Sequence, residues 1–261
     1  MRELEINHAA LAHEINDLAL AAGRTILEIY ATDFTVELKA DSSPVTAADT
    51  AAEDIITQGL HILTPSIPVV AEEAVAGGRI PDTSGGIFWL VDPLDGTREF
   101  LSRNGEFTVN IGLIKDGVPV LGVVHAPALN ATYLGYAELG ATRTTGTSPP
   151  EVIRARKIPA DGLTVVASRR HGDPSEIDRF LDGRTVAARK TVGSSIKFCT
   201  VAVGEADIYP RYGRTMEWDT AAGHAVLIAA GGRIVTTEKL PLTYGKPNFE
   251  NPGFVAWGNG A

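Results

Sequence analysis

The chain has 261 residues, of which 32 are acidic and 23 are basic, so its formal net charge is −9. This length fits one large domain or two small intimate ones, with enough core to fold without disulfides or a structural metal. The acidic balance argues against a general binder of nucleic acid or anionic membranes. It also means that a phosphate substrate would need a local source of positive charge.

The single cysteine, Cys199, excludes an internal disulfide and is typical of a protein from the reducing cytoplasm. We interpret it as a small buried apolar residue. The N-terminal stretch mixes both charges, and no run approaches the ~18 apolar residues of a membrane span. We therefore expect a cytoplasmic protein without an integral membrane segment, and leave peripheral contact with the inner membrane open.

Two helices and two buried strands are predicted first. Apolar residues recur at helical spacing between 11 and 29. Thr46-Ala-Ala-Asp49 is a capping box, with Asp in place of Glu, for a second helix. Apolar runs at 67–71 and 87–91 are typical of buried strands, and they end in Glu72 and Asp92 respectively. Carboxylates thus follow both strands, where α/β proteins usually place their sites.

Antiparallel strands are predicted next. Residues 107–115 and 118–124 alternate, and the Asp116-Gly117 pair between them is a hairpin signal. Residues 131–136 fit a third strand. We expect loops at 75–86 and 142–150, which are rich in Gly, Pro, Ser and Thr.

From residue 163 onward, helices and strands alternate. Strands are predicted before residue 194 and at 163–167, 206–210, 234–237 and 254–257. Helices are predicted after Asp173, with Pro174 in the first position, and at 194–203 and 218–230. We therefore expect two α/β lobes that form one catalytic unit. Residues 1–145 carry most of the proposed metal ligands, and residues 146–261 carry the substrate pocket.

Carboxylates dominate the candidate site. Asp92 and Asp95 lie where a strand breaks into Pro and Gly, in a turn that directs carboxylates and carbonyls into one small volume. Glu72, after the neighbouring strand, and Asp219, at a helix start, extend the set. Oxygen ligands without thiols or a histidine cluster favour Mg²⁺ over Zn²⁺. Alone, the Asp-x-x-Asp-x-Thr fragment also fits a capped turn with solvated carboxylates.

Five segments resemble the inositol monophosphatase family of Mg²⁺-dependent, lithium-sensitive phosphatases. They are PVTAAD (44–49), AEE (71–73), WLVDPLDGT (89–97), EWDTAAG (217–223) and AGG (230–232). Within that family the chain looks most like the CysQ-type 3′(2′),5′-bisphosphate nucleotidases, through DGTREF (95–100), RNGEFTVN (103–110), LGVVHAP (121–127), GSSIKFC (193–199) and YPR leading into MEWD (209–219). The resemblance covers nearly the whole chain and implies a layered αβαβα sandwich.

The resemblance also implies the metal ligands. Glu72 and Asp92, with the Leu94 carbonyl, would hold a first Mg²⁺, and Asp92, Asp95 and Asp219 would hold a second. Two such cations clamp the attacking and leaving oxygens of an in-line displacement, and a third ion remains open. Lithium is expected to inhibit by taking one of these positions.

Three residues are implied as catalytic. Thr97 and Asp49 resemble the family's pair that orients and deprotonates the attacking water, and Glu72 is grouped with them. Asp49 alone also fits a simple helix-start residue.

Substrate contacts are expected from Asp219, from residues at two helix starts, and from Arg211 just after a strand. Backbone N–H groups of Gly96 and Thr97 would bind the scissile phosphate. The candidates for a second phosphate are Ser194, Ser195, Lys197 and Arg211. Ser194 also fits a simple helix cap.

Other positions carry less weight. Lys39 is expected near the entrance of the site. Gly245 is a departure, because the family resemblance predicts Asn there, and this puts a contact to the base or ribose in doubt. His125, His171 and His224 do not cluster, and we interpret them as structural or surface residues.

The favoured function is hydrolysis of the 3′-phosphate of adenosine 3′,5′-bisphosphate to AMP and phosphate in sulfate assimilation. The 3′-phosphoadenylylsulfate is a further candidate substrate. An inositol- or sugar-monophosphatase with the same metals is one alternative, and a metal-dependent nucleotide sensor is a non-enzymatic one. The expected partner is a small nucleotide, without a nucleic acid polymer, and the chain is expected to be a monomer or a homodimer.

Overall fold

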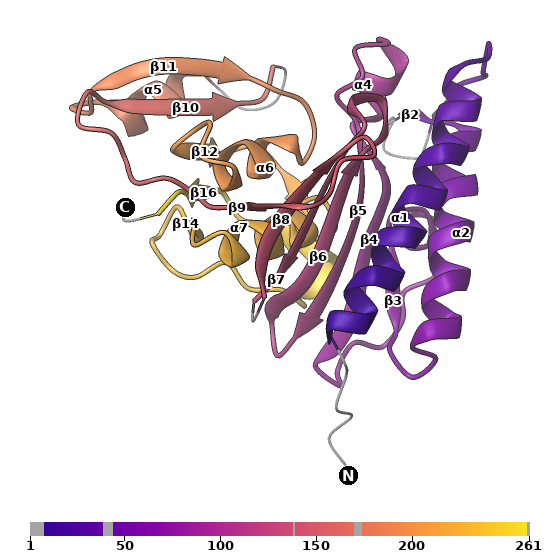
Figure 1. Cartoon of the computed structure of the whole chain (residues 1–261). Helices are drawn as coiled ribbons and strands as arrows, with labels where there is room; N and C mark the ends of the chain where they lie inside the picture. The colour runs from indigo at the N-terminus through magenta and orange to yellow at the C-terminus, as the bar shows by residue number, and fades with distance from the viewer. Residues whose placement is uncertain (1–7, 39–43, 138, 170–173, 260–261) are drawn as a thin grey trace.

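The computed structural model describes residues 8–38, 44–137, 139–169 and 174–259. Helices and sheets alternate in it as five layers, so the predicted αβαβα sandwich is confirmed (Figure 1). The sequence expectations at Lys39, His171 and Asp173 lie outside the described residues. Among the helices that are described, none has the length and apolar character needed to span a bilayer.

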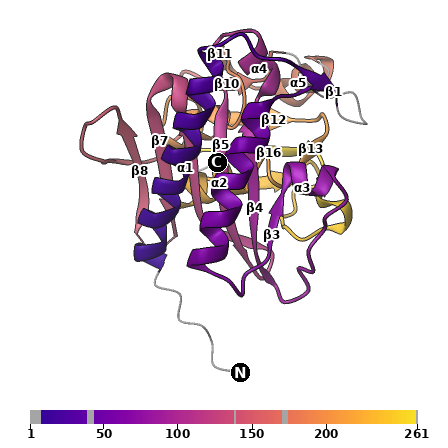
Figure 2. The same ribbon diagram turned by 90° about the vertical axis from the view of Figure 1, so that its right-hand side faces the viewer.

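Helices α1 (His8–Tyr30) and α2 (Ala47–Leu63) form the first layer and cross one face of a seven-stranded sheet (Figure 2). The predicted capping box starts α2. The Thr46 hydroxyl accepts a hydrogen bond from the Ala48 N–H at 3.2 Å, and the Thr46 N–H donates to Asp49 Oδ2 at 2.7 Å. This local pairing buries Asp49 at the first turn of the helix.

The seven-stranded sheet runs in the order β3-β4-β5-β6-β7-β8-β9, with one parallel pair, β3 and β4, at its edge. The strands are β3 (Val69–Ala71), β4 (Ile87–Asp95), β5 (Thr108–Lys115), β6 (Val118–Ala126), β7 (Ala131–Tyr136), β8 (Gly140–Thr145) and β9 (Glu151–Ile153). The hairpin and the third strand are confirmed. The loop expected at 142–150 is wrong in its first part, because the β-branched threonines there pair with β7.

The second sheet has the order β11-β10-β12-β16-β14. Its strands are β10 (Leu163–Ala167), β11 (Val186–Thr191), β12 (Ile208–Arg211), β14 (Arg233–Thr236) and β16 (Phe254–Trp257). Helices α6 (Ile196–Ala202) and α7 (Ala221–Ala229) lie between the two sheets, and α5 (Pro174–Leu181) packs on the outer face. We propose the division into two lobes on this basis; the first sheet continues to Ile153.

Short elements complete the chain. They are β1 (Glu37–Leu38), β2 (Pro44–Val45), α3 (Glu72–Ala76), α4 (Thr97–Leu101), η1 (Pro127–Leu129), β13 (Thr215–Met216), η2 (Pro247–Phe249) and β15 (Glu250–Asn251). The loop predicted at 75–86 is correspondingly shorter, because α3 includes its first two residues.

A row of glycines allows α7 to pack closely on the first sheet. Gly112, Gly122 and Gly135 are direct partners on β5, β6 and β7. A Cβ atom at these positions would lie 2.3–2.9 Å from the nearest atom of α7, so only glycine allows this approach. Because Asp219 lies two residues before α7, the close packing also sets the position of Asp219.

We expect Gly135→Ala to destabilise the fold, because its Cβ would lie 2.3 Å from Val226 Cα in the helix backbone. Overpacking of this kind costs about 1–3 kcal/mol, which corresponds to a fall of about 2–12 °C in Tm. Gly85→Ala is the matched control, since no atom lies within 4 Å of its added Cβ. Equal melting temperatures for the two variants in a thermal scan would show that α7 can shift to accommodate the methyl group.

Candidate active site

Two acidic residues come together because their strands are parallel. Ala71 of β3 pairs with Val91 of β4, so Glu72 and Asp92 follow at the same edge of the sheet. Both line a cavity of about 790 Å³. Helix α3 begins at Glu72. Glu53 of α2 stabilises its first turn, because Glu53 Oε2 accepts the Glu73 N–H at 2.7 Å. Burial raises the pKa of Glu53 to about 7.

A bulge on β4 turns Asp95 to the same side as Asp92. Asp92 pairs with Asn110 and Asp95 with Thr108, so three steps on β4 match two steps on β5. In a regular strand, residues three apart point to opposite faces of the sheet. The extra residue in the bulge shifts this alternation by one, so Asp92 and Asp95 point to the same face. Both carboxylates line the cavity. The strand predicted at 87–91 is therefore too short, since pairing with β5 resumes beyond the bulge.

Asp219 approaches these carboxylates from the second lobe. Its Oδ2 accepts the Met216 N–H at 2.8 Å, and its backbone carbonyl accepts the Ser195 hydroxyl at 2.8 Å. Burial in the cavity wall, together with the nearby charges of Asp95 and Glu72, raises the pKa of the Asp219 carboxyl above its usual range. The three acidic groups therefore repel one another across the cavity.

This donor set fits a hard divalent cation. The four proposed carboxylate ligands and Leu94 line one cavity, together with Glu73 and Glu99. A cation there would offset the repulsion that, after burial, raises the pKa of Asp219. Across the described part of the chain, no three His, Cys, Asp or Glu side chains are already gathered tightly enough to hold an ion. Asp92 Oδ1 accepts the Leu94 N–H at 3.0 Å, and Asp219 Oδ2 accepts the Met216 N–H at 2.8 Å.

Asp49 and Thr97 meet at the edge of this acidic group. Asp49 Oδ2 is held by the Thr46 N–H and by the Thr46 hydroxyl, at 2.7 and 2.8 Å, which leaves Oδ1 directed at the Thr97 hydroxyl, 3.3 Å away. The Leu94 carbonyl lies at the same 3.3 Å from Thr97 Oγ1 and competes for the same proton. The negative charge of Asp49 favours the carboxylate as acceptor, because charge-assisted hydrogen bonds are the stronger ones.

The expected phosphate-binding segments face each other across the two lobes. Gly96 has a φ of 91° and Ser194 a φ of 45°, and a Cβ on Gly96 would lie 3.3 Å from Ser194 Cβ. Both residues line the cavity. The helices that follow have only five and seven residues, so the expectation of phosphate binding rests on backbone N–H groups rather than on a helix dipole.

The three remaining candidates for binding the second phosphate differ in their access to the cavity. Ser195 is buried behind the wall, where its hydroxyl accepts from Asn110 Nδ2 at 2.9 Å and donates to the Asp219 carbonyl. Lys197 and Arg211 line the cavity. Lys197 Nζ also donates to the Ser194 carbonyl at 2.5 Å, and burial lowers the pKa of Lys197 to about 8. Arg211 donates to the carbonyls of the loop that follows it.

Comparison with known proteins assigns this arrangement to a family. The model of the "Inositol monophosphatase family" matches residues 9–254. The chain belongs to the inositol monophosphatase family. It is 45% identical to a 3′(2′),5′-bisphosphate nucleotidase CysQ of Escherichia coli O157:H7, over 92% of this chain and 97% of that protein.

Two solved structures share the inositol monophosphatase fold of this chain. CysQ from Bacteroides thetaiotaomicron has a TM-score of 0.82 and 36% identity, and covers 99% of this chain and 100% of its own. Inositol monophosphatase from Anabaena has a TM-score of 0.77 and 26% identity, over 97% of this chain and 92% of its own.

One residue of this inositol monophosphatase site was missed by the sequence analysis. Asn110 is fully buried, and its Nδ2 donates to Asp95 Oδ2 at 3.4 Å and to Ser195 Oγ. It thereby joins a proposed metal ligand of the first lobe to the second lobe. The only signal was its place at the end of the RNGEFTVN stretch, where it looked like an ordinary strand residue.

The departure at Gly245 has a backbone explanation. Its φ is 86°, in the left-handed region that Gly and, less readily, Asn adopt, and its N–H donates to Glu217 Oε2 at 2.8 Å. Gly245 is therefore tied to the loop before α7, outside the cavity wall. His224 is buried against the Tyr244 hydroxyl, and Cys199 is fully buried.

Proposed function

We propose that this chain is a Mg²⁺-dependent phosphatase that removes the 3′-phosphate of adenosine 3′,5′-bisphosphate, giving AMP and phosphate. The same site would accept 3′-phosphoadenylylsulfate. Support comes from the bisphosphate nucleotidases among its relatives and from the charge pattern of one cavity. Such an activity would recycle a by-product of sulfate assimilation.

The charge pattern carries the proposal. The cavity is lined by the four proposed ligands Glu72, Asp92, Asp95 and Asp219 and by two further carboxylates, Glu73 and Glu99. Its basic residues are Lys197, Arg211 and Arg214 of the second lobe and Arg98 of the first. A phosphate can reach the carboxylates only through bound cations, whereas a second phosphate can pair directly with the basic side chains. A cavity with both proposed metal ligands and basic side chains favours a substrate with two phosphates over a simple phosphomonoester.

Divalent cations held by Glu72, Asp92, Asp95, Asp219 and the Leu94 carbonyl would supply positive charge and fix the scissile phosphate. The chain's own residues handle the proton. Thr97 donates its hydroxyl hydrogen to Asp49 Oδ1, which leaves Thr97 Oγ1 as an acceptor toward the attacking water. As the water gives its proton to Thr97 Oγ1, Thr97 would pass its own hydroxyl hydrogen to Asp49 Oδ1. The new P–O bond forms as the bond from phosphorus to the ribose 3′-oxygen breaks, and that oxygen would take a proton from solvent. The Gly96 and Thr97 N–H groups would orient the phosphate for in-line attack.

A kcat/KM panel tests this function. The substrates are adenosine 3′,5′-bisphosphate, its 2′,5′ isomer, inositol 1-phosphate and fructose 1,6-bisphosphate, the last as a bisphosphate without a base. We expect kcat/KM for the adenosine bisphosphate to exceed that for inositol 1-phosphate by about 10- to 100-fold, the value of one well-placed charged contact. Faster turnover of inositol 1-phosphate would instead support a monophosphatase, and binding without phosphate release would support a sensor.

Activity should require Mg²⁺, because positioning and charge stabilisation of the phosphoryl group depend on the cations. Excess chelator should abolish phosphate release, and added Mg²⁺ should restore it. Lithium should inhibit at about 1–50 mM, since a monovalent ion in a weak hard-cation site supplies too little charge. Phosphate release that persists in excess EDTA would contradict the metal-dependent assignment.

A further inference from the structure

The wall opposite the acidic residues includes a strained turn. Ser194 has a φ of 45°, a left-handed conformation that non-glycine residues hold only when their surroundings enforce it. This turn carries Ser194 to the cavity and leads directly into α6, which carries Lys197. Whatever enforces the turn therefore also sets where these two side chains lie.

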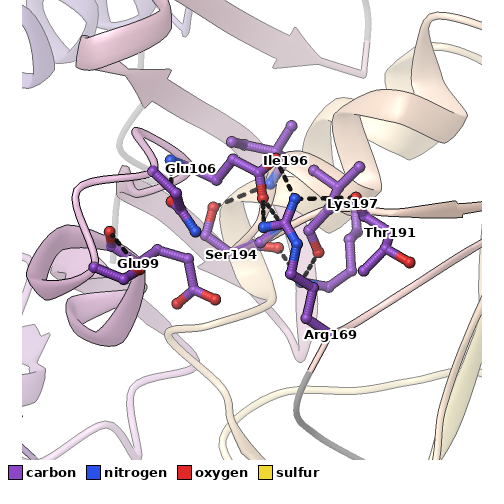
Figure 3. Close-up of polar contacts among 11 residues, drawn as sticks. Glu99, Glu106, Arg169, Thr191, Ser194, Ile196 and Lys197 are labelled. Carbon is purple, nitrogen blue, oxygen red and sulfur yellow. Dashed lines mark hydrogen bonds and ion pairs between the residues drawn. The ribbon is translucent and has the colours of Figure 1, made fainter.

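Three side chains hold the backbone on both sides of the turn (Figure 3). Lys197 Nζ donates to the carbonyls of Ser194 and Val192, at 2.5 and 3.4 Å. Glu106 Oε2 accepts the Gly193 N–H at 2.7 Å. Arg169 Nη2 donates to the Thr191 carbonyl at 3.5 Å. Each of the four consecutive residues 191–194 thus has a backbone group bonded to one of these side chains.

Glu106 and Arg169 come from different lobes and form a two-pronged ion pair. Nη1 bonds to Oε2, and Nη2 bonds to Oε1 at 2.8 Å. Glu106 lies between α4 and β5 in the first lobe, and Arg169 follows β10 in the second. Their side chains are 21% and 39% exposed, so the pair is not expected to contribute much to global stability.

The two lobes pack tightly against each other at Gly193. A Cβ on Gly193 would lie 2.7 Å from Glu99 Cγ and 2.8 Å from the Glu106 carbonyl. The 191–194 segment therefore rests directly on the first-lobe loop that carries Glu106.

We propose that Glu106 and Arg169 are positioning residues for substrate selectivity. By holding the 191–194 turn against the first lobe, they place Ser194 and Lys197 at the distance from the scissile phosphate at which a second phosphate is bound. This inference rests on the proposed function. It assigns the pair a role in recognising the second phosphate, and none in the attack on the first.

The test compares wild type with Glu106→Gln and Arg169→Lys in saturating Mg²⁺. Substrates are adenosine 3′,5′-bisphosphate and adenosine 3′-monophosphate, which lacks the second phosphate. For Glu106→Gln we expect KM for the bisphosphate to rise about tenfold, with kcat and the kinetics of the monophosphate changed less than about twofold. Arg169→Lys keeps the Glu106–Gly193 bond and should show a smaller rise in KM.

A binding measurement gives a second readout that does not depend on turnover. By isothermal titration with Mg²⁺ present, AMP, which retains the 5′-phosphate, should bind Glu106→Gln about tenfold more weakly, while inorganic phosphate binds as in wild type. Asp178→Asn is the matched control, because it removes the exposed Arg189–Asp178 ion pair of the same lobe. It should leave both affinities unchanged, and Tm is measured for every variant.

The charge-swapped double variant Glu106→Arg, Arg169→Glu distinguishes the effect of the ion pair with Arg169 from that of the hydrogen bond to the Gly193 N–H. It can restore an ion pair, but it leaves no carboxylate at position 106 for the Gly193 N–H, so we expect no rescue. Full rescue would overturn the positioning role of the Gly193 contact.

Equal losses on both substrates, or unchanged AMP binding in a folded Glu106→Gln, would also overturn the proposal. A wild type without preference for the bisphosphate overturns the proposed function instead, and weaker AMP binding by Glu106→Gln would then still uphold the positioning role.

Discussion

Asp95→Asn is expected to lower kcat by about 10³-fold or more, equivalent to ~4 kcal/mol of barrier, while raising the Tm of the metal-free protein. The amide keeps an oxygen but not the charge that attracts a divalent cation. Burial raises the pKa of Asp219, and the charges of Asp95 and Glu72 raise it further, so the Asp95 charge disfavours a second carboxylate beside it when no metal is bound. Removing one charge relieves that repulsion, and we expect a gain of about 1–3 °C.

The measurement pairs phosphate release with thermal scans in EDTA and in Mg²⁺. Wild type should gain stability from Mg²⁺, because an ion that binds only the folded state shifts the folding equilibrium, and Asp95→Asn should gain less. Asp116→Asn is the matched control: it makes the same change at the β5–β6 hairpin, where Asn-Gly suits the turn as well as Asp-Gly. Turnover of Asp95→Asn within about tenfold of wild type would exclude Asp95 as a key ligand.

Asp49→Asn is expected to reduce kcat by about 10²–10⁴-fold, the usual contribution of a positioned general base. Asp49 has two tasks on two oxygens. Oδ2 accepts from Thr46 and caps α2, and Oδ1 accepts from the Thr97 hydroxyl. Asparagine has one carbonyl oxygen, which can keep the cap. Its amide group then donates toward Thr97 and cannot take a proton, so the fold should survive while catalysis fails.

Two variants separate these tasks. Thr46→Ala removes the capping hydroxyl, and we expect it to cost about 1 kcal/mol of stability with little change in kcat. Asp54→Asn, on the exposed side of the same helix, should change neither quantity. If Asp49→Asn instead lowered Tm as Thr46→Ala does and left kcat unchanged, Asp49 would be a helix cap alone.

Elements with local causes were predictable. The capping box involves residues three apart, and the hairpin at Asp116-Gly117 requires only the two left-handed residues that this pair supplies. The strands at 131–136 and 163–167 match β7 and β10 residue for residue. In each case the deciding interactions lie within a few positions along the chain, where composition and periodicity can be read directly.

The bulge on β4 was not predictable in this way. It depends on how β5 pairs on both sides of Pro93 and Leu94, and that register is set by a neighbouring strand. The same limit applies to Ser195, whose hydroxyl looked suited to a phosphate. It is committed to Asn110, 85 positions away, and to the Asp219 carbonyl, 24 positions away.

By itself, the sequence determined which chemistry is available: an acidic chain with Glu72, Asp92, Asp95 and Asp219 after strands or at a helix start, and with family motifs around them. Only the tertiary structure decided how these groups face one another. Parallel pairing aligns Glu72 with Asp92, and the glycine row Gly112, Gly122 and Gly135 lets α7 bring Asp219 close.

The ion pair beside the 191–194 turn likewise joins Glu106 and Arg169, which are 63 positions apart. Residue types and short-range spacing are properties of the chain alone. Distances between lobes exist only once close packing and long-range hydrogen bonds have fixed them.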